Sequence, residues 1–262
     1  MTALSERASP TIPELRPVHV AVNPVRRGPI VLATNGSGAT DAPARIADLL
    51  SVHLGLPIEV IPDRDIARFA RETSPTIIVM EAAPHGRFHQ SDIGARAAQV
   101  LRDTDCPVLT VPATLHELPR TIVAAVDFGA SSLRAVQAAL LVVGEGGRVI
   151  LTHVVPPPVH PSWLKIVPDE ELEMNINALF AELRADIGPA IRDGVTVETR
   201  IVTGEPVDSV LALASEIGAD VVAAGTHGPG RLARVFLGGV ATNLLQGAEQ
   251  AVLLAPVRRR TA

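Results

Sequence analysis

The sequence has little of the residue types on which several protein classes depend. Aromatic residues make up 2% of the chain, tyrosine is absent, and Lys165 is the sole lysine. Proteins that bind DNA or RNA neutralise its phosphates with clustered lysine and arginine. This chain has 23 basic and 28 acidic residues, and its net charge is −5. We therefore expect no nucleic-acid partner.

Cysteine and long apolar runs are also scarce. Cys106 stands alone, which excludes an internal disulfide or a cysteine zinc site and fits a reducing compartment. No apolar run approaches the roughly 20 residues that span a bilayer. We expect a cytoplasmic protein without a membrane partner. Residues 1–27, rich in proline and arginine and without an apolar signal region, are expected to form a loosely ordered leader.

The core must be built from alanine, valine, leucine and isoleucine, because hydrophobic residues make up 47% of the chain despite the lack of aromatics. Such a core suits parallel strands buried between helices. From residue 119 to 258, short apolar segments alternate with helical patterns. This alternation predicts an open parallel sheet with right-handed crossovers. Its strands are expected at residues 122–126, 148–155, 195–202, 220–224 and 251–255.

The chain repeats itself imperfectly. Residues 30–35, IVLATN, resemble 122–127, IVAAVD, at an offset of 92, whereas 107–112, PVLTVP, resemble 251–256, AVLLAP, at an offset of 144. The offsets differ by 52 residues, about one strand and one helix. We expect two tandem α/β domains, the first half (residues 28–115) truncated and the second half (residues 119–258) complete.

Each half ends in a short apolar strand that would otherwise expose an edge. We therefore expect the halves to join at these strands as an internal pseudo-dimer. The pattern is also compatible with a larger homo-oligomer.

A glycine-rich turn, GTHGPGRLARVFLGGVA, follows the strand that ends at Ala224. Glycines at a strand-to-helix turn let backbone N–H groups approach an anion, and the helix N-terminus adds a partial positive charge. In an open parallel sheet this turn lies at the carboxyl ends of the strands, where ligands bind. The pattern predicts phosphate binding. The alternative is that the glycines serve only tight turns and helix packing.

Several motifs together resemble the universal stress protein family. Its nucleotide-binding members carry G-x2-G-x9-G followed by serine or threonine, and Gly225, Gly228 and Gly238 have that spacing. The resemblance covers residues 121–257, including a strand that ends in Val126 and Asp127. It implies a Rossmann-like fold of the HUP type and a regulatory module. An enzyme is not expected, because no general base is identifiable, although slow ATP hydrolysis stays open.

The resemblance also implies a ligand, namely ATP or a related adenine nucleotide, alone or with Mg²⁺. Val126, Asp127 and Val154 would surround the adenine and the ribose. The phosphate side would be formed by loop and helix residues: Gly225, His227, Gly228, Gly230, Gly238, Gly239 and Val240.

Two departures from the family pattern weaken this expectation. The serine or threonine after the third glycine is Gly239 here, so a hydroxyl contact worth on the order of 1 kcal/mol is lost. Whether Gly239 has a positive φ that serine could not adopt stays open. In the first half, Glu81 and Pro84 replace Gly225 and Gly228, so we expect no nucleotide there. The rival interpretation is a nucleotide-free interaction protein of the same fold.

Other motifs are weaker. Residues 228–233 spell the dinucleotide fingerprint G-x-G-x-x-A, but that fingerprint belongs in the first turn of a domain, and here only one strand follows. Ser131 and Ser132 have no paired base, so we expect them to cap a helix.

Overall fold

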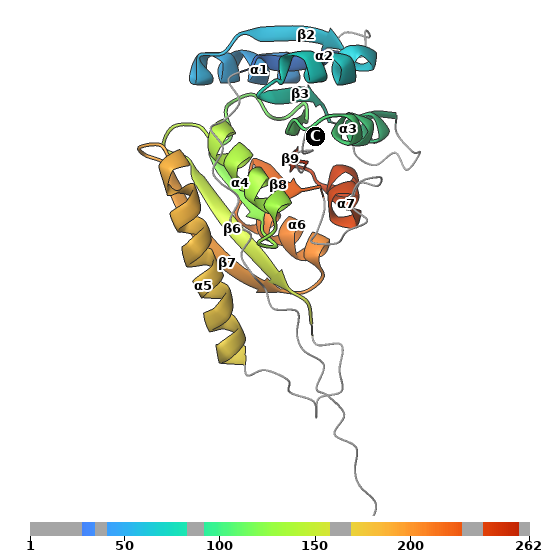
Figure 1. Cartoon of the computed structure of the whole chain (residues 1–262). Coiled ribbons are helices and arrows are strands. Elements are labelled where there is room, and N and C mark those ends of the chain that lie inside the picture. The colour runs from blue at the N-terminus through green and yellow to red at the C-terminus, as the bar shows by residue number, and fades with distance from the viewer. Residues whose placement is uncertain (1–27, 35–40, 83–91, 158–168, 227–237, 257–262) are drawn as a thin grey trace, which may run out of the picture.

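The computed structural model describes residues 28–34, 41–82, 92–157, 169–226 and 238–256 (Figure 1). The leader and residues 227–237, which include His227, Gly228 and Gly230, lie outside this part of the chain. The first half contains, in chain order, β1 (Ile30–Thr34), α1 (Asp41–Leu54), β2 (Ile58–Pro62), a 3-10 turn η1 (Asp63–Asp65), α2 (Ile66–Thr73), β3 (Ile77–Glu81), α3 (Asp92–Asp103) and β4 (Val108–Val111).

The second half is longer by one strand and one helix. It contains β5 (Thr121–Ala125), α4 (Ala130–Val142), β6 (Arg148–Val155), α5 (Asp169–Ile187), a 3-10 turn η2 (Gly188–Ala190), β7 (Thr196–Thr203), α6 (Pro206–Glu216), β8 (Val221–Gly225), α7 (Gly239–Gly247) and β9 (Ala251–Ala255). When the described elements of the two halves are compared in chain order, α5 and β7 have no counterpart in the first half. The predicted loss of one strand and one helix is confirmed.

All the described strands form one nine-stranded sheet, ordered β2-β1-β3-β4-β9-β8-β5-β6-β7. Every neighbouring pair is parallel except β4 and β9. The α/β class expected from the alternating pattern is therefore confirmed. None of the described helices is both long and apolar enough to cross a membrane.

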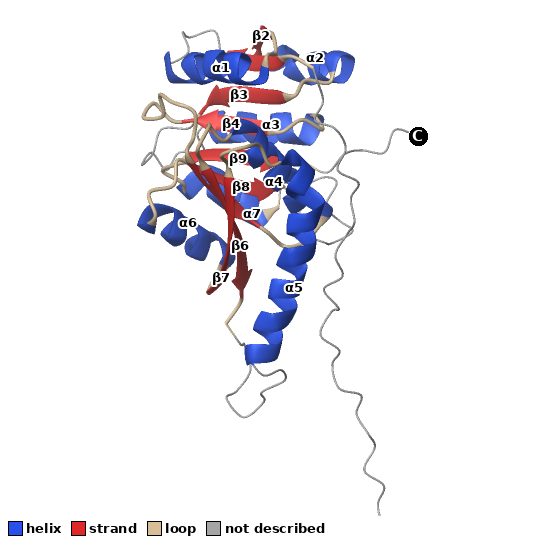
Figure 2. Cartoon of the chain, turned by 90° about the vertical axis from the view of Figure 1, so that its left-hand side faces the viewer, coloured by secondary structure: helices blue, strands red, loops and turns tan. Residues whose placement is uncertain are grey.

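Helices cover both faces of the sheet, as Figure 2 shows. Strand residues alternate between two buried clusters. Ile30 and Leu32 belong to the cluster that includes residues of α1, α4 and α5, whereas Val31 and Ala33 belong to the cluster that includes residues of α2, α3, α6 and α7. Because side chains of a strand point alternately to opposite faces, an all-aliphatic strand can fill both clusters. The layers therefore follow directly from the aliphatic composition.

The last strands of the two halves pair with each other. Val108 lies opposite Leu254 and Thr110 opposite Val252 in an antiparallel register, and every residue of β4 and β9 is buried. Arg134 of α4 reinforces this join, because it donates to the carbonyl oxygens of Pro256, at 2.6 Å, and Asp105, at 2.8 Å. The first half thus extends the sheet of the second without a gap.

A second contact between the halves involves an ionisable pair. Arg192, which follows η2, donates to Nε2 of His53 on α1 and to the carbonyl oxygen of Val143 at the end of α4. Burial lowers the pKa of His53 below its ordinary value of 6.5, and the neighbouring Arg192 guanidinium lowers it further. Carbonyl groups of Val143 and Leu141 and the charge of Glu145 act in the opposite direction without reversing the shift.

This pair predicts a loss of stability in acid. The unfolded chain protonates His53 at a higher pH than the folded chain does, so acidification through about pH 6.5 favours unfolding. Urea titrations between pH 5 and 8 should show a steeper fall in the free energy of unfolding for the wild type than for His53→Gln. Identical pH profiles would show that the pair does not couple protonation to folding.

Candidate functional site

The carboxyl ends of β5 and β6 are tied to each other. The Val126 N–H donates to the Thr152 carbonyl at 2.8 Å, and Nδ1 of His153 lies 2.7 Å from the Val126 carbonyl oxygen. Val126 is buried, whereas Val154, two residues from Thr152 on β6, is partly exposed. The two strands therefore present a fixed edge that carries two of the predicted adenine-contacting residues.

Asp127 begins the turn from β5 into α4. Its Oδ1 accepts a hydrogen bond from the Gly129 N–H at 2.9 Å, and its own N–H donates to Oγ of Ser132 at 3.3 Å. The Ser132 hydroxyl in turn donates to the Gly129 carbonyl at 3.0 Å. The carboxylate is thereby oriented while the residue stays partly exposed at the edge of the sheet.

Phe128 adopts a left-handed backbone with φ of 58°, a conformation that bulky residues rarely take. Its ring packs on His153 at a centroid distance of 5.0 Å and edge-on against Phe180 of α5 at 5.2 Å. This aromatic contact holds the backbone that places Asp127. The sequence carries no sign of it, because a phenylalanine after a strand ordinarily indicates a core residue with φ below zero.

Gly225, at the end of β8, packs against the first turn of α4. A Cβ at this position would lie 2.3 Å from Ser131 Oγ and 2.7 Å from the Ser131 carbonyl carbon. The Ser131 hydroxyl donates to the Ala255 carbonyl at 3.2 Å. Gly225 is therefore needed for close packing of strand and helix, which is the alternative role considered for these glycines.

The prediction that Ser131 and Ser132 cap a helix is wrong. Gly129 is the N-cap of α4 and no side chain caps it, because the Ser131 and Ser132 hydroxyls bond to Ala255 and to the Asp127 turn instead. Both serines are buried, so they join α4 to the strand ends at this edge.

The start of α7 lies beside the end of β8. The Gly238 N–H donates to the Thr226 carbonyl at 2.8 Å, and the Thr226 N–H donates to the Ala255 carbonyl at 3.1 Å. Gly238 is the N-cap, with φ of −60° and no side-chain cap. Gly239 and Val240, the first two residues of the helix, are exposed.

Gly239 has room for a side chain. No atom lies within 4 Å of a Cβ built on it, and it is not among the described glycines with positive φ. The possibility that its backbone excludes serine is therefore ruled out by this geometry.

Seven of the ten predicted site residues belong to the described part of the chain, and all seven lie at the carboxyl ends of β5, β6 and β8 or at the start of α7: Val126, Asp127, Val154, Gly225, Gly238, Gly239 and Val240. Hydrogen bonds link these elements in sequence from β6 to β5, α4, β9, β8 and α7. The edge combines a partly exposed carboxylate, apolar side chains and a helix N-terminus that has no side-chain cap from the described part of the chain.

Comparisons with known proteins agree with this architecture. The model of the Universal stress protein family matches residues 119–256, more than half of the chain. The chain belongs to the universal stress protein family.

Individual relatives cover either one half or both. Universal stress protein Rv1636 of Mycobacterium tuberculosis is 29% identical over 138 residues, which are 52% of this chain and 94% of the relative. A universal stress protein structure from Archaeoglobus fulgidus covers 90% of this chain and 99% of its own, with 17% identity and a TM-score of 0.60. A universal stress protein solved in complex with cAMP is 27% identical over 54% of this chain and 100% of its own, with a TM-score of 0.42. The Archaeoglobus likeness shows that the fold extends across both halves.

The geometry at Gly225 and Gly239 predicts opposite effects of the same substitution. Gly225→Ala should destabilise the fold by roughly 1 to 3 kcal/mol, because the new methyl group meets Ser131 backbone and side-chain atoms that cannot both move aside. Gly239→Ala should be neutral or stabilise by up to about 1 kcal/mol, because alanine favours a helix. Urea unfolding of both variants measures the difference. Equal free energies of unfolding for the Gly225→Ala and Gly239→Ala variants would contradict the packing role of Gly225.

Proposed function

We propose that the second half is a regulatory domain that binds ATP or a related adenine nucleotide. The observation that carries this proposal is the hydrogen bond between Gly238 and Thr226, at 2.8 Å. It brings together the two ends of the glycine-rich turn at the base of α7, beside the strand ends that carry Val126, Asp127 and Val154. A turn anchored in this way aims the helix N-terminus at a ligand that lies across the strand ends.

Each part of this edge has a chemical role in the proposal. Val154, which is partly exposed, offers apolar surface to the adenine, and the buried Val126 lies beside it at the end of β5. The Asp127 carboxylate, held by the Gly129 N–H through Oδ1, accepts hydrogen bonds from ribose hydroxyls. The first N–H groups of α7 have no partner within the helix, and its dipole favours negative charge, so Gly239 and Val240 donate to phosphate oxygens. Mg²⁺ would be held mainly by the phosphates themselves.

The first half has a different role in this proposal. Glu81 ends β3 as Gly225 ends β8, since their partners Val111 and Ala255 hold equivalent places on β4 and β9. A carboxylate here repels a polyphosphate. We propose that this half binds no nucleotide and instead acts as the internal partner of the second domain, so that β4 and β9 form a pseudo-dimer contact.

The rival function is a nucleotide-free interaction protein of the same fold. The packing role of Gly225 and the missing hydroxyl at Gly239 favour it. Mass spectrometry of small molecules released from the purified, denatured protein distinguishes the two, together with calorimetric titration of the ligand-stripped protein with ATP, AMP and cAMP. Release or saturable binding of an adenine nucleotide supports the proposal, and no binding of any of the three contradicts it.

Gly239→Ser should tighten ATP binding by roughly tenfold. The structure leaves room for the side chain, and its hydroxyl at the first turn of α7 can donate to a charged phosphate oxygen, a bond worth about 1.5 kcal/mol or somewhat more. Calorimetric titration measures the affinity, with Gly239→Ala as the control that adds a Cβ without a hydroxyl. If both variants bind ATP as the wild type does, Gly239 does not face a phosphate.

Acidic substitutions in the glycine-containing turns of the two halves should have different effects on ATP affinity. Gly228→Glu places a carboxylate in the turn proposed to hold phosphate and should weaken ATP binding by at least about 100-fold. The matched variant Gly86→Glu, in the corresponding turn of the first half, should leave the affinity unchanged. Fluorescence competition with a labelled nucleotide measures both. Equal losses would show that the nucleotide does not select the second half.

A further inference from the structure

The described part of the first half has no counterpart of α5 and β7, and one apolar side chain on its β2 strand is exposed as a result. Val60 of β2 pairs with Leu32 of β1, and Leu151 of β6 pairs with Ala124 of β5. Leu32 and Ala124 are equivalent positions at the repeat offset of 92, so Val60 is the counterpart of Leu151. Leu151 is 0% exposed, within the cluster that includes α5. Val60 is 59% exposed.

Among the described residues, no strand lies at the outer edge of β2. On the second half, β7 pairs with β6 along eight residues, from Thr196 to Thr203. On the first half, β2 lies at the end of the strand order and pairs only with β1 among the described strands. A strand edge with an exposed apolar side chain is a template for pairing with another strand.

The opposite end of the sheet, β7, is a poorer template. Its exposed residues Thr196, Arg200 and Thr203 are all polar, and Glu198 forms an ion pair with Arg148 of β6 at 3.9 Å. Charges along an edge strand oppose the approach of a second strand. β2 carries one charged residue, Glu59, which faces the side of the sheet opposite to Val60.

The β2 sequence is complementary to itself in an antiparallel register centred on Val60. The two valines then lie opposite each other on the α1 side of the sheet, and Ile58 lies opposite the partner's Pro62. Glu59 lies opposite the partner's Ile61, so no like charges meet. Pro62 has no N–H to donate, and it limits the pairing to the residues before it.

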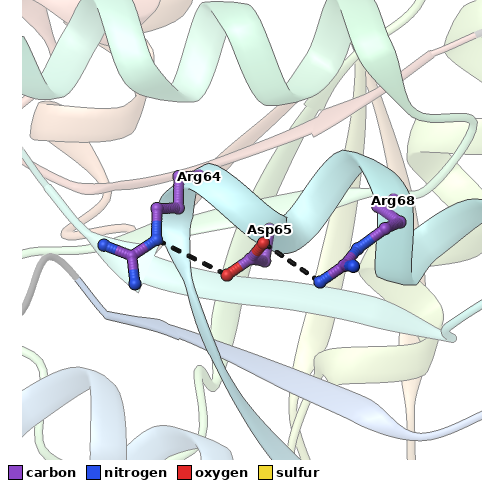
Figure 3. A network of polar contacts seen from close by, with 3 residues as sticks. All are labelled: Arg64, Asp65 and Arg68. Atoms are coloured by element: carbon purple, nitrogen blue, oxygen red, sulfur yellow. Dashed lines mark hydrogen bonds and ion pairs between the residues drawn. The ribbon is translucent and has the colours of Figure 1, made fainter.

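Charges at the end of β2 also favour this register. Figure 3 shows Asp65 between Arg64 and Arg68, with its Oδ2 3.6 Å from Arg64 Nε and its Oδ1 3.1 Å from Arg68. Asp63 at the same end pairs with Arg96 at 2.7 Å, so three arginines lie against two carboxylates and positive charge is in excess. Arg64 and Arg68 are exposed, and Asp65 is partly exposed. Antiparallel pairing brings this end of one strand toward Glu59 of the other, within reach of extended arginine and glutamate side chains.

We propose that two copies of this chain pair through β2, edge to edge, in the antiparallel register centred on Val60. The contact is isologous, because the same residues of both copies meet across a two-fold axis. It is distinct from the β4 and β9 contact, which is already used within each chain, and it does not depend on nucleotide binding.

Sedimentation equilibrium of the full chain over a dilution series tests the proposal, with a dimer of about twice 27.5 kDa expected. Val60→Lys sets two lysines opposite each other and should raise the dimer dissociation constant at least about tenfold. The matched control is Val52→Lys, because Val52 on α1 is 86% exposed and lies on no strand edge. This variant should dimerise as the wild type does. Thermal melting confirms that both variants are folded.

Two results would overturn the proposal. One is a full chain that stays monomeric throughout the dilution series. This includes the case in which dimers form only after residues 1–27 are removed, because the leader would then occupy the β2 edge. The other is a dimer that Val60→Lys and Val52→Lys leave equally intact, since another surface would then form it.

Discussion

The antiparallel pairing of β4 and β9 is the contact on which the rest of the molecule depends. Both strands are buried along their whole length, and each covers an edge of the other. The contact also reverses the direction of the parallel sheet, so that the carboxyl edges of the two halves face opposite ways. Arg134 reaches across the join from α4, and the same helix carries Ser131 and Ser132 at its start. The join and the candidate site are therefore built on one rigid element.

At the candidate site, the residues proposed to contact a ligand also have packing and hydrogen-bonding roles within the fold. Gly225 is required by the approach of Ser131, whether or not a phosphate lies nearby. Asp127 is oriented by its own turn and by the left-handed Phe128. In the proposed function, these contacts preorganise the edge and so lower the entropic cost of binding a nucleotide. They also mean that a family motif by itself does not separate a binding glycine from a packing glycine.

Local pattern predicted the elements well because strand alternation and helix periodicity are properties of short segments. The strand expected at residues 195–202 is Thr196–Thr203, and the one expected at 122–126 is Thr121–Ala125. The difference between the two repeat offsets located the missing strand and helix. The family assignment is likewise established, whereas the nucleotide and the residues that hold it stay predictions.

What the sequence could not show depends on contacts between distant residues. The Ser131 hydroxyl donates to the Ala255 carbonyl, 124 positions away, and does not cap its own helix. The local sequence around Ser131 does not indicate this bond. The positive φ of Phe128 depends on rings from β6 and α5. Likewise, the exposure of Val60 is invisible in the string IEVIP. It follows from the element order, in which the described part of the first half has no counterpart of α5, the helix of the cluster that buries Leu151.

Covalent linkage changes the nature of the β4 and β9 contact. Between separate chains, two strands of four and five residues would associate to an extent set by protein concentration. Here the segment from residue 112 to 120 is part of the same chain, and β9 meets β4 at an effective concentration that dilution cannot lower. The two strands are consequently free to diverge in sequence, since each needs to fit only the other and never a copy of itself. PVLTVP and AVLLAP already differ in this way, with Thr110 placed where its hydroxyl reaches the Val252 carbonyl.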